Sequence, residues 1–352
     1  MKAWEKNIRK VTPYVPGEQP QKENMIKLNT NENHYPPSKK VEEIKNKMDM
    51  EIFRLYPDSN VTPLVKALSK YHNIKEDQIF VGVGSDDVLA MSFMTYFNSD
   101  KPILFPDITY SFYDVWAKML GIPYVQLPLN DSFEIVKEDY FRENGGIVIA
   151  NPNAPTSIAL GVDKIEEIVA ANQESVVIVD EAYVDFGAQS CLPLIEKYDN
   201  LLVVRTFSKS RSLAGMRIGY AMGNAALIAA LNDVKQSFNS YTMNQTAIAF
   251  GVASVEDNAY FKESVQKIIS TREWFSREMK ELGFHFGDSK ANFLFVTHET
   301  ASAKDIFEAA KQKDIFFRFF DKPRINNYLR ITIGTDEQMQ KVIAFLKEYL
   351  KK

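Results

Sequence analysis

Gly146-Ile-Val-Ile-Ala150 is an entirely apolar run of strand length, and two similar runs follow it along the chain. These are Val176-Val-Ile-Val179 and Leu201-Leu-Val-Val204. Strands that are apolar on both faces are typical of a mostly parallel sheet that helices cover on both sides. Segments with helical periodicity alternate with strand-like runs over about residues 50–250. The sequence therefore predicts an α/β fold built on a mostly parallel sheet.

The pattern changes after about residue 254, which predicts a second domain. An amphipathic helix is expected from about Ala259 to Leu282, and short strands alternate with helices after it. We therefore expect a large domain at 50–254 and a smaller α+β domain at 255–352. The first 35 or so residues are polar and rich in Pro, Asn and Glu. Residues 1–49 are expected to form an arm that contributes to the small domain, with Met25–Leu28 as a short strand.

The composition narrows the possible partners. With 352 residues, 45% of them apolar and 25% charged, the chain can form about two domains with large cores. Its net charge of −4 predicts no general attraction to nucleic acid or to an anionic membrane. A charged N-terminus and the lack of an apolar run of about 20 residues argue against a secretory signal and a membrane span. The single cysteine, Cys191, excludes an internal disulfide and a thiolate zinc cage. We expect a cytoplasmic protein.

Lys209 stands just after the third apolar run, in the segment Ser208-Lys-Ser-Arg-Ser-Leu-Ala-Gly-Met-Arg217. A lysine taken at random is a solvated surface residue. At the end of a buried strand, however, its amine is partly desolvated and suited to Schiff-base chemistry. Ser208 and Arg217 would supply hydrogen-bond donors for a phosphate. The segment therefore favours a reactive lysine beside an anion site.

Asp180 and Tyr183, which follow the second apolar run, favour a flat, cationic ligand. Asp180 could be a solvated carboxylate, but a buried carboxylate there would pair with a cation such as a pyridinium nitrogen. Tyr183 could be a packed aromatic, or it could donate a hydrogen bond to a ring oxygen. Ligands of open α/β sheets bind at the carboxyl ends of the strands, where both residues are expected.

The sequence contains two weaker indications of a binding site and lacks several common catalytic motifs. Gly84-Ser-Asp86 opens a predicted helix, whose free N–H groups could bind an anion. Tyr110 could stack on a flat ring. The four histidines form no HExxH motif, and the chain has neither a GxSxG elbow nor a P-loop.

A series of motifs extends over nearly the whole chain. They are Pro13-Tyr-Val-Pro-Gly17, Lys27-Leu-Asn-Thr-Asn-Glu-Asn33, Arg54-Leu-Tyr-Pro-Asp58, Gly84-Ser-Asp86, Tyr110-Ser-Phe-Tyr113, Val179-Asp-Glu-Ala-Tyr-Val-Asp-Phe186, the segment Arg205–Tyr220, Ala291-Asn-Phe293 and Tyr328-Leu-Arg-Ile-Thr-Ile-Gly334. In this order they resemble the fold-type I, pyridoxal-phosphate-dependent aminotransferases. Within that family the resemblance is to the class II enzymes that act on L-histidinol phosphate.

The resemblance implies pyridoxal phosphate as the cofactor and a role for each matching residue. Lys209 would bond to the cofactor and move the reacting proton. Asp180 would pair with the ring nitrogen, Tyr183 with the ring oxygen, and Tyr110 would stack on the ring. The residues implied at the phosphate are Ser85, Asp86, Thr206, Ser208 and Arg217. Tyr56 would reach the phosphate of a neighbouring subunit, which implies a homodimer with shared sites.

The resemblance also implies the substrates. Arg330 would bind their anionic end, and Tyr14 and Arg318 would assist at the phosphate of L-histidinol phosphate. A guanidinium accepts a phosphate or a carboxylate, which suits an enzyme that binds two substrates in turn. The implied reaction is ping-pong transfer of the amino group to 2-oxoglutarate, in histidine biosynthesis. An aromatic or broad-specificity aminotransferase, or a decarboxylase of a phosphorylated amino acid, would share the cofactor residues. A non-catalytic regulator is a third hypothesis, which no DNA-binding segment supports.

The chain departs from the family pattern at three positions. The usual Asn-Pro-Thr-Gly is here Ala154-Pro-Thr-Ser157. Ala154 thus replaces the asparagine that contacts the ring oxygen, and we expect Asn153 to take over that contact. Ser157 stands in place of a glycine, and His34 stands where the family often has a proline.

Overall fold

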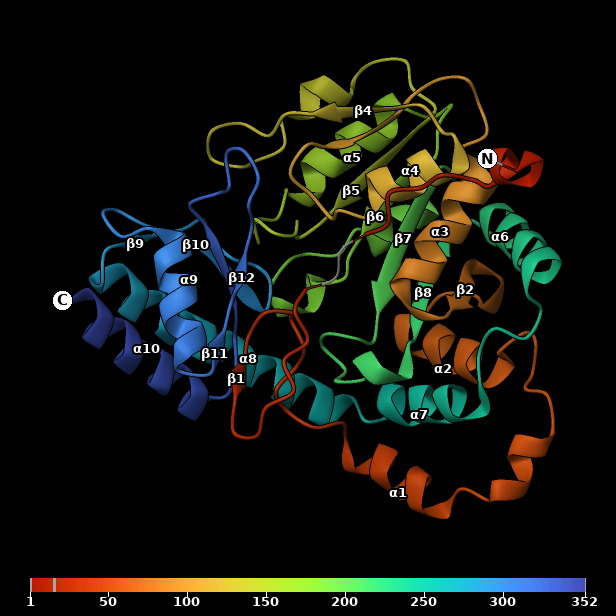
Figure 1. Cartoon of the computed structure of the whole chain (residues 1–352). Helices are drawn as coiled ribbons and strands as arrows, with labels where there is room; N and C mark the ends of the chain where they lie inside the picture. The colour runs from red at the N-terminus through yellow and green to blue at the C-terminus, as the bar shows by residue number, and fades with distance from the viewer. Residues whose placement is uncertain (1, 15–16, 352) are drawn as a thin grey trace.

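The computed structural model describes residues 2–14 and 17–351, so Val15 and Pro16 of the first motif lie outside it (Figure 1). Its largest sheet has the strand order β2-β8-β7-β6-β5-β3-β4. The strands are β2 (Ile79–Gly82), β3 (Ile103–Pro106), β4 (Tyr124–Leu127), β5 (Gly146–Ala150), β6 (Val177–Asp180), β7 (Leu201–Thr206) and β8 (Gly219–Gly223). β8 runs antiparallel to β2 and β7, and the other pairings are parallel. The predicted α/β fold with a mostly parallel sheet is confirmed.

Helices cover both faces of this sheet, because its central strands are apolar on both sides. In β5, Ile147 and Ile149 pack into one core, whereas Val148 and Ala150 pack into the other. The helices of the first core are α1 (Lys39–Lys47), α2 (Thr62–His72), α5 (Val162–Ala171) and α7 (Gln245–Glu256). Those of the second are α3 (Gly84–Tyr96), α4 (Tyr113–Leu120) and α6 (Ala225–Phe238). The result is a three-layered body (Figure 1).

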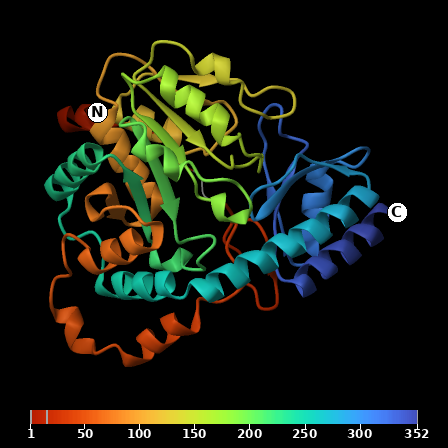
Figure 2. The same cartoon turned by 180° about the vertical axis from the view of Figure 1, so that it is seen from behind.

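A smaller antiparallel sheet has its own core. Its strand order is β12 (Arg318–Phe319), β13 (Leu329–Thr332), β10 (Phe293–His298) and β9 (Phe284–His285). Three helices pack on it, namely α8 (Asn258–Glu281), α9 (Ala303–Gln312) and α10 (Asp336–Leu350). Figure 2 shows α8 running from beneath the large sheet to the small one, where it lies beside α10.

Part of the N-terminal arm joins the small sheet region through β1 (Ile26–Lys27), whereas α1 packs on the large sheet. β1 pairs in parallel with β11 (Ile315–Phe316). β11 and β12 are separate strands although only Phe317 lies between them, because β11 pairs with the arm and β12 pairs with β13. Seven short 3-10 helices complete the described elements: η1 (Ala3–Asn7), η2 (Met50–Arg54), η3 (Glu76–Gln78), η4 (Lys137–Tyr140), η5 (Val184–Phe186), η6 (Leu192–Glu196) and η7 (Ala214–Met216). Over residues 2–14 and 17–351, none of the helices has the length and apolar character needed to cross a membrane.

Candidate active site

A cavity lies at the carboxyl ends of β5, β6 and β7, where the arm meets the large sheet. The open end of a parallel sheet is where α/β proteins bind ligands. Most of the residues predicted as cofactor contacts line it: Ser85, Asp86, Tyr110, Asp180, Tyr183, Thr206, Ser208, Lys209 and Arg217. The structure therefore brings together side chains from four separate segments of the large domain.

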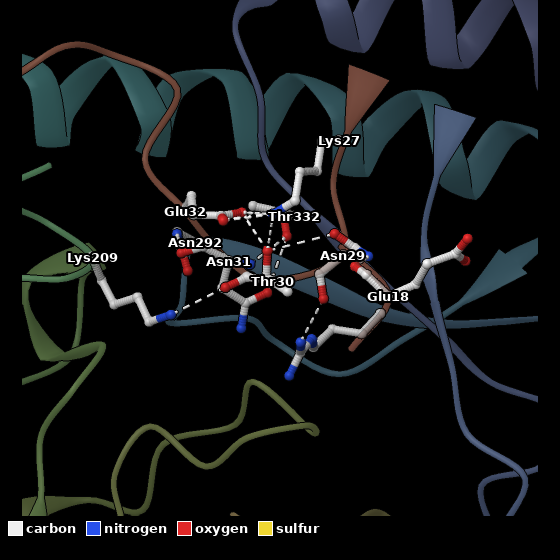
Figure 3. A network of polar contacts seen from close by, with 10 residues as sticks. Glu18, Lys27, Asn29, Thr30, Asn31, Glu32, Lys209, Asn292 and Thr332 are labelled. Atoms are coloured by element: carbon white, nitrogen blue, oxygen red, sulfur yellow. Dashed lines mark hydrogen bonds and ion pairs between the residues drawn. The ribbon is translucent and has the colours of Figure 1, made fainter. Parts of the chain in front are cut away.

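Lys209 follows β7 and extends toward the arm. Its Nζ donates a hydrogen bond to the backbone oxygen of Thr30 at 3.1 Å. The same ammonium group lies 5.8 Å from the centre of the Tyr183 ring. The amine points toward the arm (Figure 3), and it lies in the cavity within reach of Tyr183, which follows β6.

Asp180 is the last residue of β6 and is only 5% exposed. Burial raises the pKa of its carboxyl to about 6, although two hydrogen bonds oppose this shift. The Tyr113 hydroxyl donates to its Oδ2 at 2.9 Å, and the Ala182 N–H donates to its Oδ1 at 3.2 Å. The next residue, Glu181, points away and pairs with Arg205 at 2.9 Å. A single carboxyl thus faces the cavity here, and a cation beside it would favour its ionised form.

The N-terminus of α3, Ser208 and Arg217 form an anion-binding corner. A guanidinium nitrogen of Arg217 lies 3.2 Å from the carboxylate of Asp86, which also accepts from the Tyr110 hydroxyl at 2.6 Å. Gly84 has φ +84°, and a Cβ there would meet Arg217 at 2.5 Å. The hydroxyls of Thr206 and Ser208 lie 3.0 Å apart, and Ile218 O is a second acceptor for the Thr206 hydroxyl at 3.3 Å. Free helix N–H groups, hydroxyls and a guanidinium are suited to a phosphate.

Arg318 and Arg330 are direct partners in the pairing of β12 with β13. Arg330 donates to the backbone oxygen of Asn29 at 2.9 Å, and its buried Nε has no hydrogen-bond partner among the described residues. Burial lowers the pKa of Arg330, and the positive charge of Arg318 lowers it further. Two adjacent guanidiniums, one of them with an unused donor, favour binding of an anion. The Tyr14 ring lies nearby and stacks on Phe112 with 4.2 Å between ring centres.

The structure does not bring Asn153 into the cavity. Its Oδ1 accepts from the Thr109 hydroxyl at 2.7 Å, and its Nδ2 donates to Ile108 O at 2.9 Å and to Thr156 Oγ1 at 3.0 Å. Because successive residues of this loop point in different directions, Ala154 lines the cavity while Asn153 faces a separate depression. The expectation that Asn153 replaces the family asparagine is therefore not met by this geometry.

Tyr56 also lies outside the cavity. Its side chain is 81% exposed and stacks on Tyr241 with 4.7 Å between ring centres. Such a position is compatible with a contact to a second subunit, which is how the resemblance places it.

Several residues that touch the site were not assigned roles from the sequence. Asn31 donates to the Tyr183 hydroxyl at 2.9 Å, and Tyr113 holds Asp180. Thr30 and Glu32 line the cavity from the arm. Burial acts to raise the pKa of Glu32, but hydrogen bonds from Lys27 and Thr30 hold it below its usual value. All four lie in the segments Lys27–Asn33 and Tyr110–Tyr113, so membership of these motifs was the signal that could have found them. Among the described residues, no group of three or more His, Cys, Asp or Glu could hold a metal ion.

Comparison with known proteins gives consistent matches over the full length. The model of the family "aminotransferase class I and II" matches residues 23–346. The histidinol-phosphate aminotransferase of Lactococcus lactis subsp. cremoris MG1363 is 53% identical, over 99% of this chain and 98% of its own length. The enzyme of the same name from Acinetobacter baylyi is 52% identical, over 99% and 98%. The structure of the Sinorhizobium meliloti histidinol-phosphate aminotransferase in complex with pyridoxal-5′-phosphate has a TM-score of 0.84 at 24% identity, covering 93% of this chain and 91% of the other. At that identity the structural match supports the fold.

Proposed function

The chain belongs to the class I and II aminotransferases, and from this we propose that it binds pyridoxal phosphate in the cavity described above and transfers the amino group of L-histidinol phosphate to 2-oxoglutarate. Family membership confirms the aminotransferase resemblance read from the sequence. The amino donor is supported by the names of the two full-length relatives. The single structural observation that carries the substrate proposal is the pair Arg318 and Arg330. They are direct cross-strand partners, and Arg330 donates to Asn29 O of the arm, which lines the cavity at the next residue, Thr30.

The chemistry of the cavity fits the cofactor. A phosphate would be held by the N-terminus of α3 together with Ser85, Ser208 and Arg217. Gly219 allows β8 to approach the start of α3 closely at this corner, because a Cβ there would lie 2.2 Å from the carbonyl carbon of Gly84. Asp180 would pair with the ring nitrogen, Tyr183 would donate to the ring oxygen, and Tyr110 would cover the ring. Thr206 orients Ser208, and Asp86 holds Arg217 and Tyr110 in place.

The chain's own residues would orient the substrate and move its proton. When bound, pyridoxal phosphate supplies an electron-poor ring that stabilises the electron pair left when the substrate Cα–H bond breaks. Lys209 Nζ would accept the proton from the substrate Cα and would be the group that carries it within the site. Asp180 would pair with the ring nitrogen and favour its protonated form. Tyr110 and the arm would cover the ring and exclude water.

Arg330 would bind the anionic end of each substrate, and Arg318 and Tyr14 would assist at the phosphate of L-histidinol phosphate. L-Histidinol phosphate presents a phosphate, whereas 2-oxoglutarate presents carboxylates at both ends. Guanidinium forks accept either group without rearrangement of the site. This supports a ping-pong route in which the two substrates occupy one site in turn, and it supports 2-oxoglutarate as the acceptor.

Further parts of the proposal concern assembly, location and domain organisation. We propose a cytoplasmic homodimer in which Tyr56 of each chain contributes to the other site. Exposed apolar residues gathered at one surface support this: Phe53, Leu55 and Tyr56 line one shallow depression, and Tyr241 stacks on Tyr56. We also propose the division into an arm at 1–49, a large domain at 50–254 and a small domain at 255–352, which the separate cores support.

An absorbance titration tests the proposed reaction. The purified chain, loaded with pyridoxal phosphate, should show a visible or near-ultraviolet cofactor band that L-histidinol phosphate converts to that of pyridoxamine phosphate. Adding 2-oxoglutarate should restore the first band. A band that ignores L-histidinol phosphate but responds to an aromatic amino acid would favour the broad-specificity alternative. The variant Lys209→Ala should bind the cofactor without covalent attachment and lose turnover by about 10²-fold or more.

A further inference from the structure

An amide from the N-terminal arm, and not from the loop at Ala154, reaches the side of the cavity where Tyr183 lies. Where the family pattern has an asparagine, Ala154 presents a methyl group. The adjacent amide, on Asn153, is engaged by Thr109, Ile108 and Thr156. The amide that does reach this side comes from the N-terminal arm, since Asn31 Nδ2 lies 2.9 Å from the hydroxyl of Tyr183.

The orientation of the Asn31 amide is fixed by its other hydrogen bonds. Asn31 is 1% exposed, and its backbone N–H donates to Thr332 Oγ1 at 3.1 Å. The Thr332 hydroxyl donates in turn to Asn31 Oδ1 at 3.0 Å. Asn292 donates to the Asn31 backbone oxygen at 3.1 Å. Figure 3 shows Asn31 among Thr332, Asn292 and Thr30. Because Oδ1 is occupied by a donor, the NH2 group must face Tyr183.

This orientation determines what the Tyr183 hydroxyl can do. An amide NH2 group has protons to give and no lone pair to offer, so the phenol oxygen accepts from Asn31. The phenol proton then remains available for another acceptor. Tyr183 lines the cavity, and the ring oxygen of the cofactor is the acceptor that the proposed function places there.

We propose that Asn31 is a positioning residue that directs the Tyr183 hydroxyl proton toward the ring oxygen of the cofactor, and so replaces from the arm the amide that Ala154 lacks. The inference rests on the proposed function, because it requires pyridoxal phosphate in this cavity. It goes beyond the family pattern, in which the loop itself supplies the amide.

The same arm segment reaches two other site residues, but through its backbone. Thr30 O accepts from Lys209, and Asn29 O accepts from Arg330 at 2.9 Å. Substituting the Asn31 side chain leaves both carbonyl groups in place. An effect of such a substitution on Tyr183 can therefore be separated from general displacement of the arm.

The test is the pH midpoint at which the visible band of the bound cofactor changes. A hydrogen bond to the ring oxygen stabilises its ionised form, and this lowers the midpoint for the proton shared between that oxygen and the nitrogen of Lys209. Asn31→Ala should raise the midpoint by about 0.5 to 1 pH unit, as expected for the loss of one hydrogen bond. Asn31→Asp is nearly isosteric and keeps the acceptor for Thr332. It should also raise the midpoint, because the phenol would donate to the new carboxylate instead.

The decisive comparison uses Tyr183→Phe. This variant should raise the midpoint, and adding Asn31→Ala to it should change nothing more, since Asn31 acts through the missing hydroxyl. Asn29→Ala is the matched control: its buried amide holds Glu18 O at 2.7 Å, away from Tyr183, so the midpoint should stay at the wild-type value.

Three results would overturn the proposal while leaving the function intact. One is a wild-type midpoint in both Asn31 variants when Tyr183→Phe shifts it. Another is a full additional shift on adding Asn31→Ala to Tyr183→Phe. The last is an equal shift in Asn29→Ala, which would indicate arm displacement. Failure of the wild-type chain to bind pyridoxal phosphate would instead contradict the proposed function.

Discussion

At the scale of single residues, Asp180 shows a conflict between stability and function. Burial raises the pKa of its carboxyl to about 6 from an ordinary value of 3.8. Well below pH 3.8 the carboxyl is neutral whether the chain is folded or unfolded. As the pH rises from 3.8 to about 6, the unfolded state ionises while the folded state still holds the proton. The cofactor-free chain should therefore lose stability over this interval, by about 3 kcal/mol.

We predict that Asp180→Asn raises the melting temperature of the cofactor-free chain at pH 7–8 and has little effect near pH 4. The amide keeps the shape of the carboxyl and cannot ionise. With pyridoxal phosphate bound, the order should reverse at neutral pH, because the wild-type carboxylate gains a cationic partner. Differential scanning fluorimetry across this pH range, with and without cofactor, measures both differences. A difference that is independent of pH would contradict the assignment of the shift to Asp180.

At the scale of elements, the close contact between β8 and the start of α3 shapes the anion-binding corner. A Cβ on Gly219 would lie 2.2 Å from the carbonyl carbon of Gly84 and 2.3 Å from the Ser85 nitrogen. Gly219→Ala should push the helix N-terminus away from the strand, weaken cofactor binding at least about tenfold and destabilise the fold by about 1–3 kcal/mol. Fluorescence titration with pyridoxal phosphate measures the affinity. Gly215→Ala is the control, since none of the described residues lies within 4 Å of its added methyl. Equal affinities in both variants would argue against this account.

The paired strands β12 and β13 should distinguish the two substrates. We predict that Arg318→Ala lowers kcat/KM for L-histidinol phosphate by about 10- to 100-fold, because a phosphate loses a charge-assisted partner. The half-reaction with 2-oxoglutarate, which relies on Arg330, should change less. Stopped-flow absorbance of the cofactor follows each half-reaction separately.

Arg324→Ala serves as a control, since Arg324 lies in the segment that connects β12 to β13. Its guanidinium is engaged by Asp107 at 3.0 Å and by the carbonyls of Leu129 and Asn130. Its loss should affect stability without selecting between the substrates. A uniform loss for both substrates in Arg318→Ala would contradict a role at the phosphate.

The sequence was most informative about the strands of the large sheet and about the residues that follow them. The apolar run Gly146–Ala150 coincides with β5, and Val176–Val179 lies within a residue of β6. Residues that follow such runs converge at the sheet edge, so Asp180 and Lys209 could be predicted from the sequence. The hydrophobic pattern of neighbouring residues is enough to place a residue along a strand, because that pattern depends only on residues close in sequence.

Contacts between distant segments could not be predicted in this way. Asn31 and Tyr183 are 152 residues apart, and Tyr113 and Asp180 are 67 apart. The direction of Asn153 depends on the shape of its loop, which the residue pattern did not specify. The separation of β11 from β12 likewise depends on where the arm pairs.

At the scale of the whole molecule, the apolar surface around Tyr56 is the feature that a monomer leaves unexplained. Leu55 is 57% exposed, and Tyr56 and Tyr241 stack on each other at the same surface. Exposed apolar groups gathered in this way are typical of interaction sites. If the proposed dimer forms here, each chain carries part of the other chain's site, and loss of the dimer should also weaken cofactor binding.

We therefore predict that Leu55→Asp gives monomers with weakened affinity for pyridoxal phosphate, because a buried, unpaired charge opposes association. Tyr56→Phe should remain dimeric and bind the cofactor more weakly by about tenfold, since it removes a single hydroxyl. Analytical ultracentrifugation gives the mass of each variant, and titration gives its affinity. The two properties should separate in Tyr56→Phe and fall together in Leu55→Asp. A monomeric Leu55→Asp chain with wild-type affinity would mean that each cavity is complete within one chain, and Tyr56 would then have no role at the cofactor.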